Sequence, residues 1–334
     1  MDSLTQLLLG AAVAAVCVPP QHRRRALLAG AVLGTLPDLD VLPLNAFVED
    51  PLLRAVRHRG ASHSLFVLLP LGLAIFALLR RIWAPVREHP RAWCVAILLA
   101  FATHVLLDAL TIYGTQLWWP LPVAPTMVGS IFIIDPAYTL WLAIGCVAAL
   151  WLGSRDGARR WLAVGLAIST AYLGWSLVAK AIVERQADRA LAAMGLGDAP
   201  RFSVPMPLNT LLWRVVALAP DGYVEAVWSI AAPGDGMVFD WHESDLVALD
   251  AVREMPSVAR FLYWNRGFVG AAVEADRMVL SDLRMGAEPT YAFRFEVAQR
   301  DGSVWRAILP VQRPWSRETL SDLPKLWARI WNPR

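Results

Sequence analysis

The sequence is short of charge and of cysteine for its length. Only 18% of its 334 residues are charged, whereas a soluble globular domain carries about a quarter. Its three cysteines, Cys17, Cys94 and Cys146, lie in apolar segments, and the C-terminal region has none. This distribution excludes a disulfide-stabilised domain and a zinc site built from thiolates.

The motifs of several common enzyme classes are also missing. The chain contains no GxSxG elbow, no Walker A loop, no Rossmann glycine pattern and no HExxH helix. It has no internal repeat and no low-complexity linker. The formal net charge is only +3, and we expect no nucleic-acid partner.

Long apolar runs take the place of the missing charge. Four stretches approach the roughly 20 residues needed to cross a bilayer, namely residues 63–79, 92–112, 131–152 and 161–179. Two shorter runs, 4–18 and 26–36, precede them. The first lacks the basic start and the cleavage site of a signal peptide, so we expect a retained helix. Residues 1–182 are therefore expected to form an α-helical integral membrane domain of five to six helices.

Arginines are concentrated in alternate connections between these runs. They occur within residues 22–25, at positions 80, 81, 87 and 91, and at 155, 159 and 160, whereas residues 113–130 contain none. The positive-inside rule places arginine-rich connections in the cytoplasm. We therefore expect a multi-pass protein of a bacterial inner membrane. Its N-terminus, residues 37–62 and 113–130, and everything after residue 182 would face the periplasm.

The composition changes after residue 182. Residues 183–200 have the pattern of a charged, amphipathic helical connector. From residue 201, short runs alternate apolar and polar residues between turn signals such as PDG, PGDG and RDG. Residues 255–264 and 320–331 have a helical pattern. Residues 201–334 are expected to form a smaller α+β, β-rich extramembrane domain.

A histidine and an aspartate interrupt the apolar run of residues 92–112. His104 and Asp108 are four residues apart, so a helix presents them on one face. An ionisable residue at the centre of a membrane helix costs about 2.5–3.5 kcal/mol on insertion scales. We interpret the pair as functional, with a pair that only satisfies itself between helices as the alternative.

Two further segments carry similar side chains. GTLPDLDVLP places Asp38 and Asp40 at the end of the second apolar run, where Pro-Asp is also common turn chemistry. HRGASHS places His58 in a loop and His63 at the first turn of the next long helix. The same stretch is compatible with a helix start capped by Ser62.

The expected topology brings these side chains to one face of the membrane. Imidazole and carboxylate ligands without cysteine suit Zn²⁺, with Mn²⁺ or Fe as alternatives, and such a set holds one or two ions. A metal of this kind activates water and stabilises a phosphoester displacement. Arg57 and Arg59 flank His58, and they are candidates for binding an anionic substrate group or for anchoring to lipid headgroups.

Five stretches resemble, in the same order, the membrane-bound metal-dependent hydrolase family, whose members include a LexA-regulated bacterial inner-membrane protein. They are MDSLTQLLLGAAV, GTLPDLD, HRGASHS, THVLLDALTIYGTQLWWP and FIIDPAYTL, all within residues 1–140. The His/Asp pattern is also distantly similar to zinc-dependent phospholipase C enzymes, which hydrolyse phosphoesters. The resemblance implies that the metal ligands are Asp38, Asp40, His58, His63, His104 and Asp108. It also implies outer-shell or additional-ligand roles for Asp2, Gln6 and Asp135, although some relatives carry His at the position of Gln6.

These features favour a membrane-embedded, metal-dependent hydrolase that cleaves a phosphoester of a lipid or lipid-linked substrate at the outer face of the membrane. In this hypothesis the catalytic residues are Asp38, His58, His63, His104 and Asp108. The alternative is a non-catalytic membrane protein with a structural metal site and a partner-binding β domain. A transporter is less favoured, because residues 161–179 contain no acidic, basic or histidine side chain.

Overall fold

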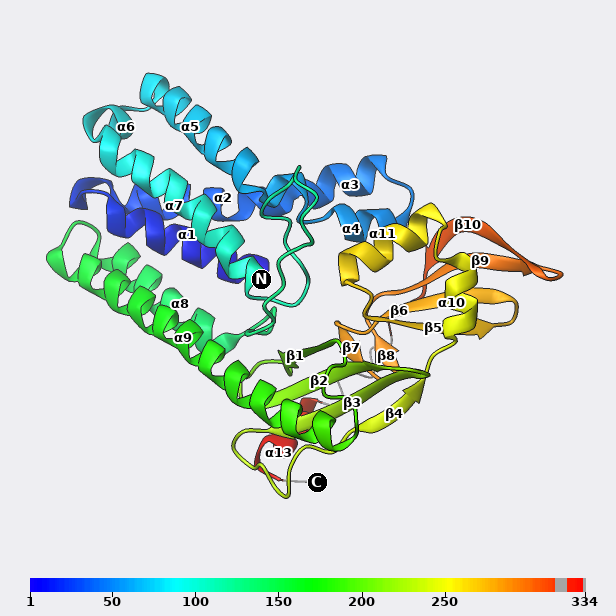
Figure 1. Ribbon diagram of the computed structural model, residues 1–334. Helices are drawn as coiled ribbons and strands as arrows, with labels where there is room; N and C mark the ends of the chain where they lie inside the picture. The colour runs from blue at the N-terminus through cyan, green and yellow to red at the C-terminus, as the bar shows by residue number, and fades with distance from the viewer. Residues whose placement is uncertain (316–322, 333–334) are drawn as a thin grey trace. The chain divides into compact units, whose positions relative to one another are not determined.

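The computed structural model describes residues 1–315 and 323–332, and it divides the chain into two compact units. The first, which we call the helical unit, comprises Met1–Pro43, His58–Val128 and Ile133–Ser176. The second, the sheet unit, comprises Leu44–Arg57, Gly129–Phe132 and Leu177–Arg334. A helical N-terminal region followed by a β-rich C-terminal domain confirms the expected fold class (Figure 1).

The helical unit consists of apolar helices joined mostly by short turns. Its α-helices are α1 (Ser3–Cys17), α2 (Arg23–Thr35), α5 (Leu65–Ile82), α6 (Ala84–Glu88), α7 (Pro90–Ala109), α8 (Pro136–Leu152) and the first part of α9 (Asp156–Ala193). Its 3₁₀ turns are η1 (Pro20–His22), η2 (Leu36–Asp40) and η3 (Ala61–His63). Helix α3 (Val41–Phe47) follows η2 directly, and α4 (Pro51–Arg57) belongs to the sheet unit.

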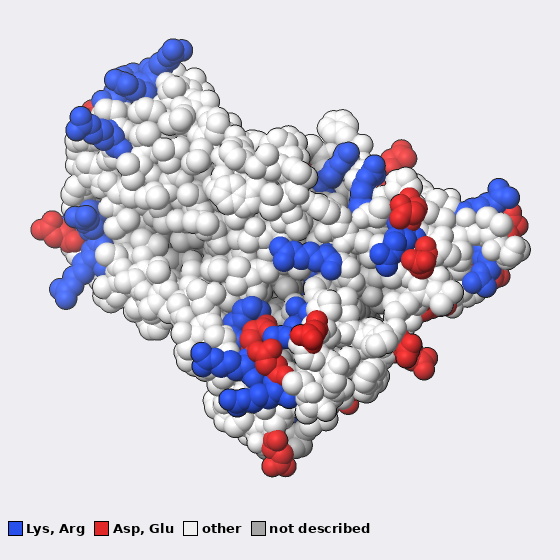
Figure 2. All heavy atoms as spheres, in the orientation of Figure 1, with Lys and Arg blue, Asp and Glu red and all other residues white. Residues whose placement is uncertain are grey.

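Among the described residues, four helical segments are long and apolar enough to cross a membrane, namely Pro20–Phe47, Leu65–Ile82, Pro90–Ala109 and Asp156–Ala193. Only 11% of the most apolar window of Leu65–Ile82 is buried inside the protein, so most of its side chains face outward and contact lipid. Figure 2 shows the same unit as a largely uncharged surface, with Lys and Arg gathered toward one end. The chain is a multi-pass membrane protein.

Two of the expected runs begin or end differently in the structure. The run expected at residues 26–36 continues through η2 and α3 into a helical segment that ends at Phe47. The run expected at residues 131–152 becomes helical only at Pro136. Asp135 fixes that start, because its carboxylate accepts hydrogen bonds from the backbone N–H groups of Ala137 and Tyr138 at 3.0 and 3.2 Å.

Helices α1 and α2 approach each other through glycines. A Cβ added to Gly10 would lie 2.3 Å from the carbonyl oxygen of Gly30, and one added to Gly30 would lie 2.2 Å from that of Gly10. Backbone contact this close excludes any side chain, as in other small-residue interfaces between membrane helices. The glycines therefore bring the start of α1 beside the end of α2, where the acidic residues lie.

The sheet unit contains two four-stranded antiparallel sheets, of order β1-β2-β3-β4 and β10-β9-β6-β5, and a β7-β8 hairpin. The strands are β1 (Arg201–Pro205), β2 (Leu212–Ala219), β3 (Gly222–Ser229), β4 (Asp240–Glu243), β5 (Val269–Glu274), β6 (Arg277–Asp282), β7 (Gly286–Ala287), β8 (Thr290–Tyr291), β9 (Arg294–Asp301) and β10 (Val304–Gln312). The helices are α10 (Leu246–Val252), α11 (Pro256–Asn265) and α13 (Leu323–Trp331). Residues 320–322 of the expected last helix lie outside the described residues.

The second part of α9 forms the core of the sheet unit with the first sheet. Its buried residues Ala179, Val183, Ala187 and Leu191 recur every four positions and so lie on one face. This face packs against side chains of β2 and β3, among them Trp213. The connector expected at residues 183–200 is thus largely a continuation of the last membrane helix, with one apolar face.

Two arginines are buried in the sheet unit beside carboxylates. Arg214 Nη2 donates to Glu225 Oε2 at 2.6 Å, and Arg284 Nη2 donates to Asp282 Oδ2 at 2.7 Å. Both guanidinium groups are fully buried, and each also donates to a backbone carbonyl. Each buried charge in these two pairs therefore has an opposite charge in contact.

Candidate metal centre

The end of α2 carries two carboxylates on the 3₁₀ turn η2. Pro37 lies in the first positions of that turn, where a missing N–H leaves no donor unsatisfied. A 3₁₀ helix has three residues per turn, so the side chains of Asp38 and Asp40, two residues apart, point in different directions. Asp38 Oδ1 lies 3.2 Å from His63 Nε2, whereas Asp40 Oδ1 lies 2.8 Å from His58 Nδ1.

The sequence suggested that His63 lies in the first turn of a long helix. It lies instead in the short turn η3. The capping residue of α5 is Ser64, whose Oγ accepts from the backbone N–H of Phe66 at 3.1 Å. Ser62, the residue favoured for that role from the sequence, has a different contact: its hydroxyl donates to Asp40 Oδ2 at 2.6 Å. The HRGASHS stretch is therefore a separate turn that presents side chains, followed by the helix.

Ser62 and Asp40 together fix the tautomer of His63. Ser62 Oγ also lies 3.0 Å from His63 Nδ1. Since the hydroxyl has one hydrogen and gives it to Asp40, it accepts a hydrogen bond from Nδ1–H. A neutral His63 ring therefore carries its lone pair on Nε2.

His104 is oriented in the same way from the other side. Its Nδ1 lies 2.7 Å from the backbone carbonyl oxygen of Gly34. A carbonyl only accepts, so Nδ1 donates and Nε2 carries the lone pair of the neutral ring. Asp108 follows one turn later on α7, and its Oδ2 lies 3.3 Å from His104 Nε2.

Four side chains converge, and we call them the His/Asp cluster: Asp38, His63, His104 and Asp108. The Nε2 atom of His63 lies 3.2 Å from each of three partners, Asp38 Oδ1, Asp108 Oδ2 and His104 Nε2. His104 Nε2 lies 3.7 Å from Asp38 Oδ1. Ligand atoms on a tetrahedral zinc ion, with bonds of about 2.1 Å, are about 3.4 Å apart. The spacing of the cluster fits that geometry.

The hydrogen-bonding chemistry of the cluster points the same way. Asp108 Oδ2 is buried and accepts no hydrogen bond, although two imidazole nitrogens are close to it. With both rings neutral, the four facing atoms are acceptors and no hydrogen lies between them. Such a set is unfavourable unless a cation lies among its members, and each ring is already held by a second hydrogen bond, as metal-binding histidines are.

Cationic groups contact the other oxygen of Asp108. Arg59 Nη2 lies 3.3 Å from Asp108 Oδ1, and the amino group of Met1 contacts the same atom. Arg59 is 3% exposed and donates to Thr111 Oγ1 at 3.1 Å. Its φ of 62° lies in the left-handed region that side chains disfavour. A strained backbone thus holds this guanidinium as a buried counter-ion, with Oδ2 turned toward the histidines.

The electrostatic surroundings also act on the charge of His63. Burial opposes protonation of the ring, but the contacts with the carboxylates of Asp108 and Asp38 outweigh it and raise the pKa of His63 above its ordinary value. An opposite charge close to a buried imidazole stabilises the imidazolium form. A metal ion at this place would supply the same stabilisation and compete with the proton.

The remaining sequence candidates lie at different distances from the cluster. His58 and Asp40 form a pair beside it, with the His58 ring 5.9 Å from the His63 ring. Gln6 is buried and donates to the backbone carbonyl of His104 at 3.2 Å. Asp2 caps α1 through the N–H of Thr5.

Asp135 and Arg57 are not part of the cluster. Asp135 caps α8 and accepts from the Tyr172 hydroxyl at 2.9 Å. Arg57 is the exposed last residue of α4, in the sheet unit. The roles expected of these two residues in a site stay predictions.

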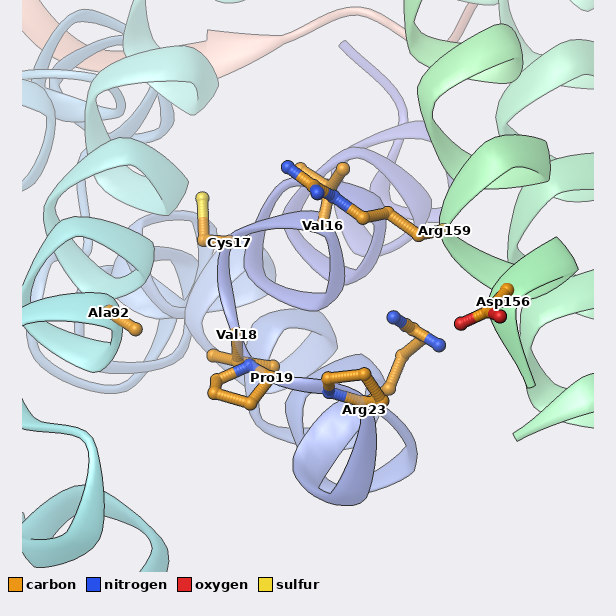
Figure 3. A pocket seen from close by; sticks show the side chains of 9 residues that line it. Val16, Cys17, Val18, Pro19, Arg23, Ala92, Asp156 and Arg159 are labelled. Carbon is orange, nitrogen blue, oxygen red and sulfur yellow. The ribbon is translucent and has the colours of Figure 1, made fainter. Parts of the chain in front are cut away.

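A hollow of about 520 Å³ lies elsewhere in the helical unit and does not include any member of the cluster. The turn that follows α1 lines it, together with Arg23, Asp156 and Arg159. Figure 3 shows Arg23 and Asp156 pointing toward one another there. The hollow thus lies near the arginine-rich connections, whereas the cluster lies at the opposite end of α7.

Comparison with known proteins places the chain in a family. The family model of the YdjM inner membrane protein matches residues 1–183, and the chain belongs to this family. It is 35% identical over 80 residues to the inner membrane protein YdjM of Escherichia coli K12 and, equally, to that of Shigella flexneri. Those matches cover 22% of this chain and 36% of each relative. No solved structure matches.

Several contacts of the centre are not apparent from the sequence. The Gly34 carbonyl, the Ser62 hydroxyl and the Met1 amino group all contact ligand-like side chains or their partners. Backbone groups and hydroxyls carry no residue-type signal for such roles. One signal was present: Ser62 and His63 are neighbours, and a hydroxyl next to a histidine is a candidate partner for its ring.

Proposed function

We propose that the protein is a membrane-embedded, metal-dependent hydrolase of the YdjM family that cleaves a phosphoester of a lipid or lipid-linked substrate. The observation that carries the proposal is the His/Asp cluster, whose four acceptor atoms have the spacing of a metal-ligand set. Imidazole and carboxylate without thiolate suit Zn²⁺, with Mn²⁺ or Fe as alternatives, in one or two ions. A bound divalent ion supplies Lewis-acid activation of water and of a phosphoryl oxygen.

His58 is suited to proton transfer beside the cluster. Its Nδ1 is held by Asp40 Oδ1 at 2.8 Å, and its side chain is 23% exposed. A carboxylate that orients one nitrogen of an accessible imidazole leaves the other nitrogen for general acid–base work. In this proposal His58 and Asp40 deliver or accept the proton, and a second ion would take His58 as a ligand instead.

The surface around the site supports a substrate with an apolar part. The loop after α7 is tied to the site, because the N–H of Gln116 donates to the carbonyl of Arg59 at 3.0 Å. It then exposes large apolar side chains, namely Trp118, Trp119, Leu121 and Val123. Tryptophans of this kind settle at the membrane–water interface. A lipid-linked phosphoester would therefore reach the cluster from the membrane surface.

Arg59 and Arg57 remain our candidates for binding the anionic group of that substrate. Arg59 is the nearer of the two to the cluster, since its Nη2 lies 3.3 Å from Asp108 Oδ1. The site lies at the arginine-poor end of the helices, which under the positive-inside rule is the periplasmic face. We propose the same side for the sheet unit.

A structural metal site with a partner-binding sheet unit is the alternative, and the burial of the cluster favours it. Three of its four residues are at most 1% exposed, and a closed four-ligand set is typical of structural zinc. The exposure of Asp38 supports the catalytic proposal, because its side chain is 14% exposed. A catalytic centre would use this open side to admit water.

The test combines metal analysis with a phosphoester screen on the full chain purified in detergent. We expect bound Zn²⁺ or Mn²⁺ and turnover that a chelator abolishes. His104→Ala should lose turnover and the metal bound by the His/Asp cluster. The matched control, His242→Ala in β4, should retain both. Bound metal without turnover on any lipid phosphoester would favour the structural alternative, and a metal-free wild type after reconstitution would overturn the proposal.

A further inference from the structure

A second cluster of ligand-type side chains lies at the other end of the helical unit. It joins His22, the last residue of η1, to Glu88 and His89 at the junction of α6 and α7. One nitrogen of each histidine and one carboxylate oxygen all lie within 4.8 Å of one another. His22 Nε2 and Glu88 Oε2 are 2.9 Å apart, and the two rings meet edge to face at 5.5 Å.

This cluster is distinct from the His/Asp cluster. His89 precedes α7, and His104 is 15 residues further along the chain, which corresponds to a rise of about 22 Å in an α-helix. The connections at this end are the arginine-rich ones. The two clusters therefore lie at opposite ends of one membrane helix.

The local sequence holds the second cluster in place. Pro20 begins the three-residue turn η1 that ends at His22, and Pro90 begins α7 and restricts the backbone of His89 before it. His22 is 4% exposed, whereas the Glu88 side chain is 54% exposed. The imidazole of His22 is thus buried, whereas the carboxylate of Glu88 is accessible to solvent. An ion can therefore enter the cluster from the aqueous side.

The ligand types determine which ion would bind. Two imidazoles and one carboxylate, without thiolate, suit Zn²⁺, Co²⁺ or Ni²⁺ and leave a coordination position for water. A hydrogen bond between His22 and Glu88 would explain that pair alone. It does not explain why His89 brings a third ligand atom within reach. Gln21 Nε2 donates to His89 Nε2 at 2.9 Å, so this nitrogen is an acceptor without metal. With an ion on Nδ1, the Gln21 amide would turn so that its oxygen accepts from Nε2–H.

We propose that His22, Glu88 and His89 form a second divalent-metal site, which joins the α1–α2 turn to the α6–α7 junction at the arginine-rich end of the helices. Residues that the sequence separates by 66 positions would share one ion. The site is independent of the proposed hydrolase activity, because none of its residues contacts the His/Asp cluster at the far end of α7.

The test is a titration of the full chain in detergent with Zn²⁺ and with Ni²⁺, followed by equilibrium dialysis and elemental analysis. We expect His89→Ala to lose one equivalent of bound metal relative to the wild type and to keep the metal of the His/Asp cluster. His104→Ala should show the reverse pattern. His242→Ala, the matched control, should bind as much metal as the wild type.

A conservative variant covers the case in which His89→Ala disturbs folding. Glu88→Gln keeps the size of a half-exposed side chain and removes only the charge, so a monodisperse protein with one fewer bound equivalent would support the site. An unchanged metal content in both Glu88→Gln and His89→Ala would overturn the proposal. So would a wild type whose bound metal is removed entirely by His104→Ala.

Discussion

Both units of the chain bury charged side chains, but they satisfy them differently. In the sheet unit Arg214 faces Glu225 at 2.6 Å and Arg284 faces Asp282 at 2.7 Å. Each pair contains one cation and one anion. In the helical unit, Asp38 and the Oδ2 atom of Asp108 face two imidazole nitrogens that carry lone pairs when the rings are neutral.

The difference separates structural charges from a site. Buried ions are costly unless they are paired and hydrogen-bonded, and the sheet unit meets that condition with its own side chains. The helical unit meets it on one side of Asp108 only, through Arg59 and the amino group of Met1. On the other side the chain presents a surplus of acceptors, and a cation from solution is the partner that would complete it.

The largest effect is expected when one member of a buried Arg–carboxylate pair in the sheet unit is removed. We expect Arg214→Met to lower the free energy of unfolding by about 3–5 kcal/mol, because Glu225 would remain buried as an unpaired charge. Replacing both residues, by Arg214→Met with Glu225→Leu, should restore most of that stability. Denaturant unfolding of the full chain measures both variants, and a double variant no more stable than the single one would contradict the assignment.

A smaller effect is expected from the hydroxyl that orients His63. Ser62→Ala removes the group that accepts from His63 Nδ1 and donates to Asp40. Outer-shell partners of this kind contribute about 10–100-fold to metal affinity. Metal affinity measured by competition with a chromophoric chelator should fall by that factor. Ser64→Ala is the control and should keep its affinity, because it loses the cap of α5 and a hydrogen bond to the Trp119 carbonyl but no hydrogen bond to a member of the His/Asp cluster.

The smallest expected effect is the pH dependence of stability, which should have one direction in the metal-free protein and the opposite direction for the stabilisation that bound metal adds. Since the pKa of His63 is raised in the fold, its charged form stabilises the metal-free protein at low pH, and this contribution is lost as the pH rises through the raised value. Metal binds the deprotonated ring, so its stabilisation grows as the pH rises. The increase in melting temperature on adding Zn²⁺ should therefore be larger at pH 8 than at pH 6. An increase independent of pH would argue against His63 as a ligand.

The fold class followed from the sequence because membrane helices and paired strands each require a recognisable pattern of apolar residues. Long uncharged runs predict membrane helices, and short alternating runs with Gly-rich turns predict strands. The grouping of residues 44–57 with the sheet unit left no such signal. It depends on the packing of α4 against α11 and β10, which lie far along the chain.

The sequence by itself determined which residue types could form a site and that they lie at one end of the helices. Spacing of four put His104 and Asp108 on one face, and antiparallel helices brought Asp38 and His63 to the same end. The tertiary structure alone decided which atoms face one another. Whether a neutral imidazole presents a lone pair depends on the hydrogen bond that its other nitrogen makes, here with the Gly34 carbonyl and the Ser62 hydroxyl. The packing of the helices sets these contacts between individual atoms, and a pattern of residue types does not specify them.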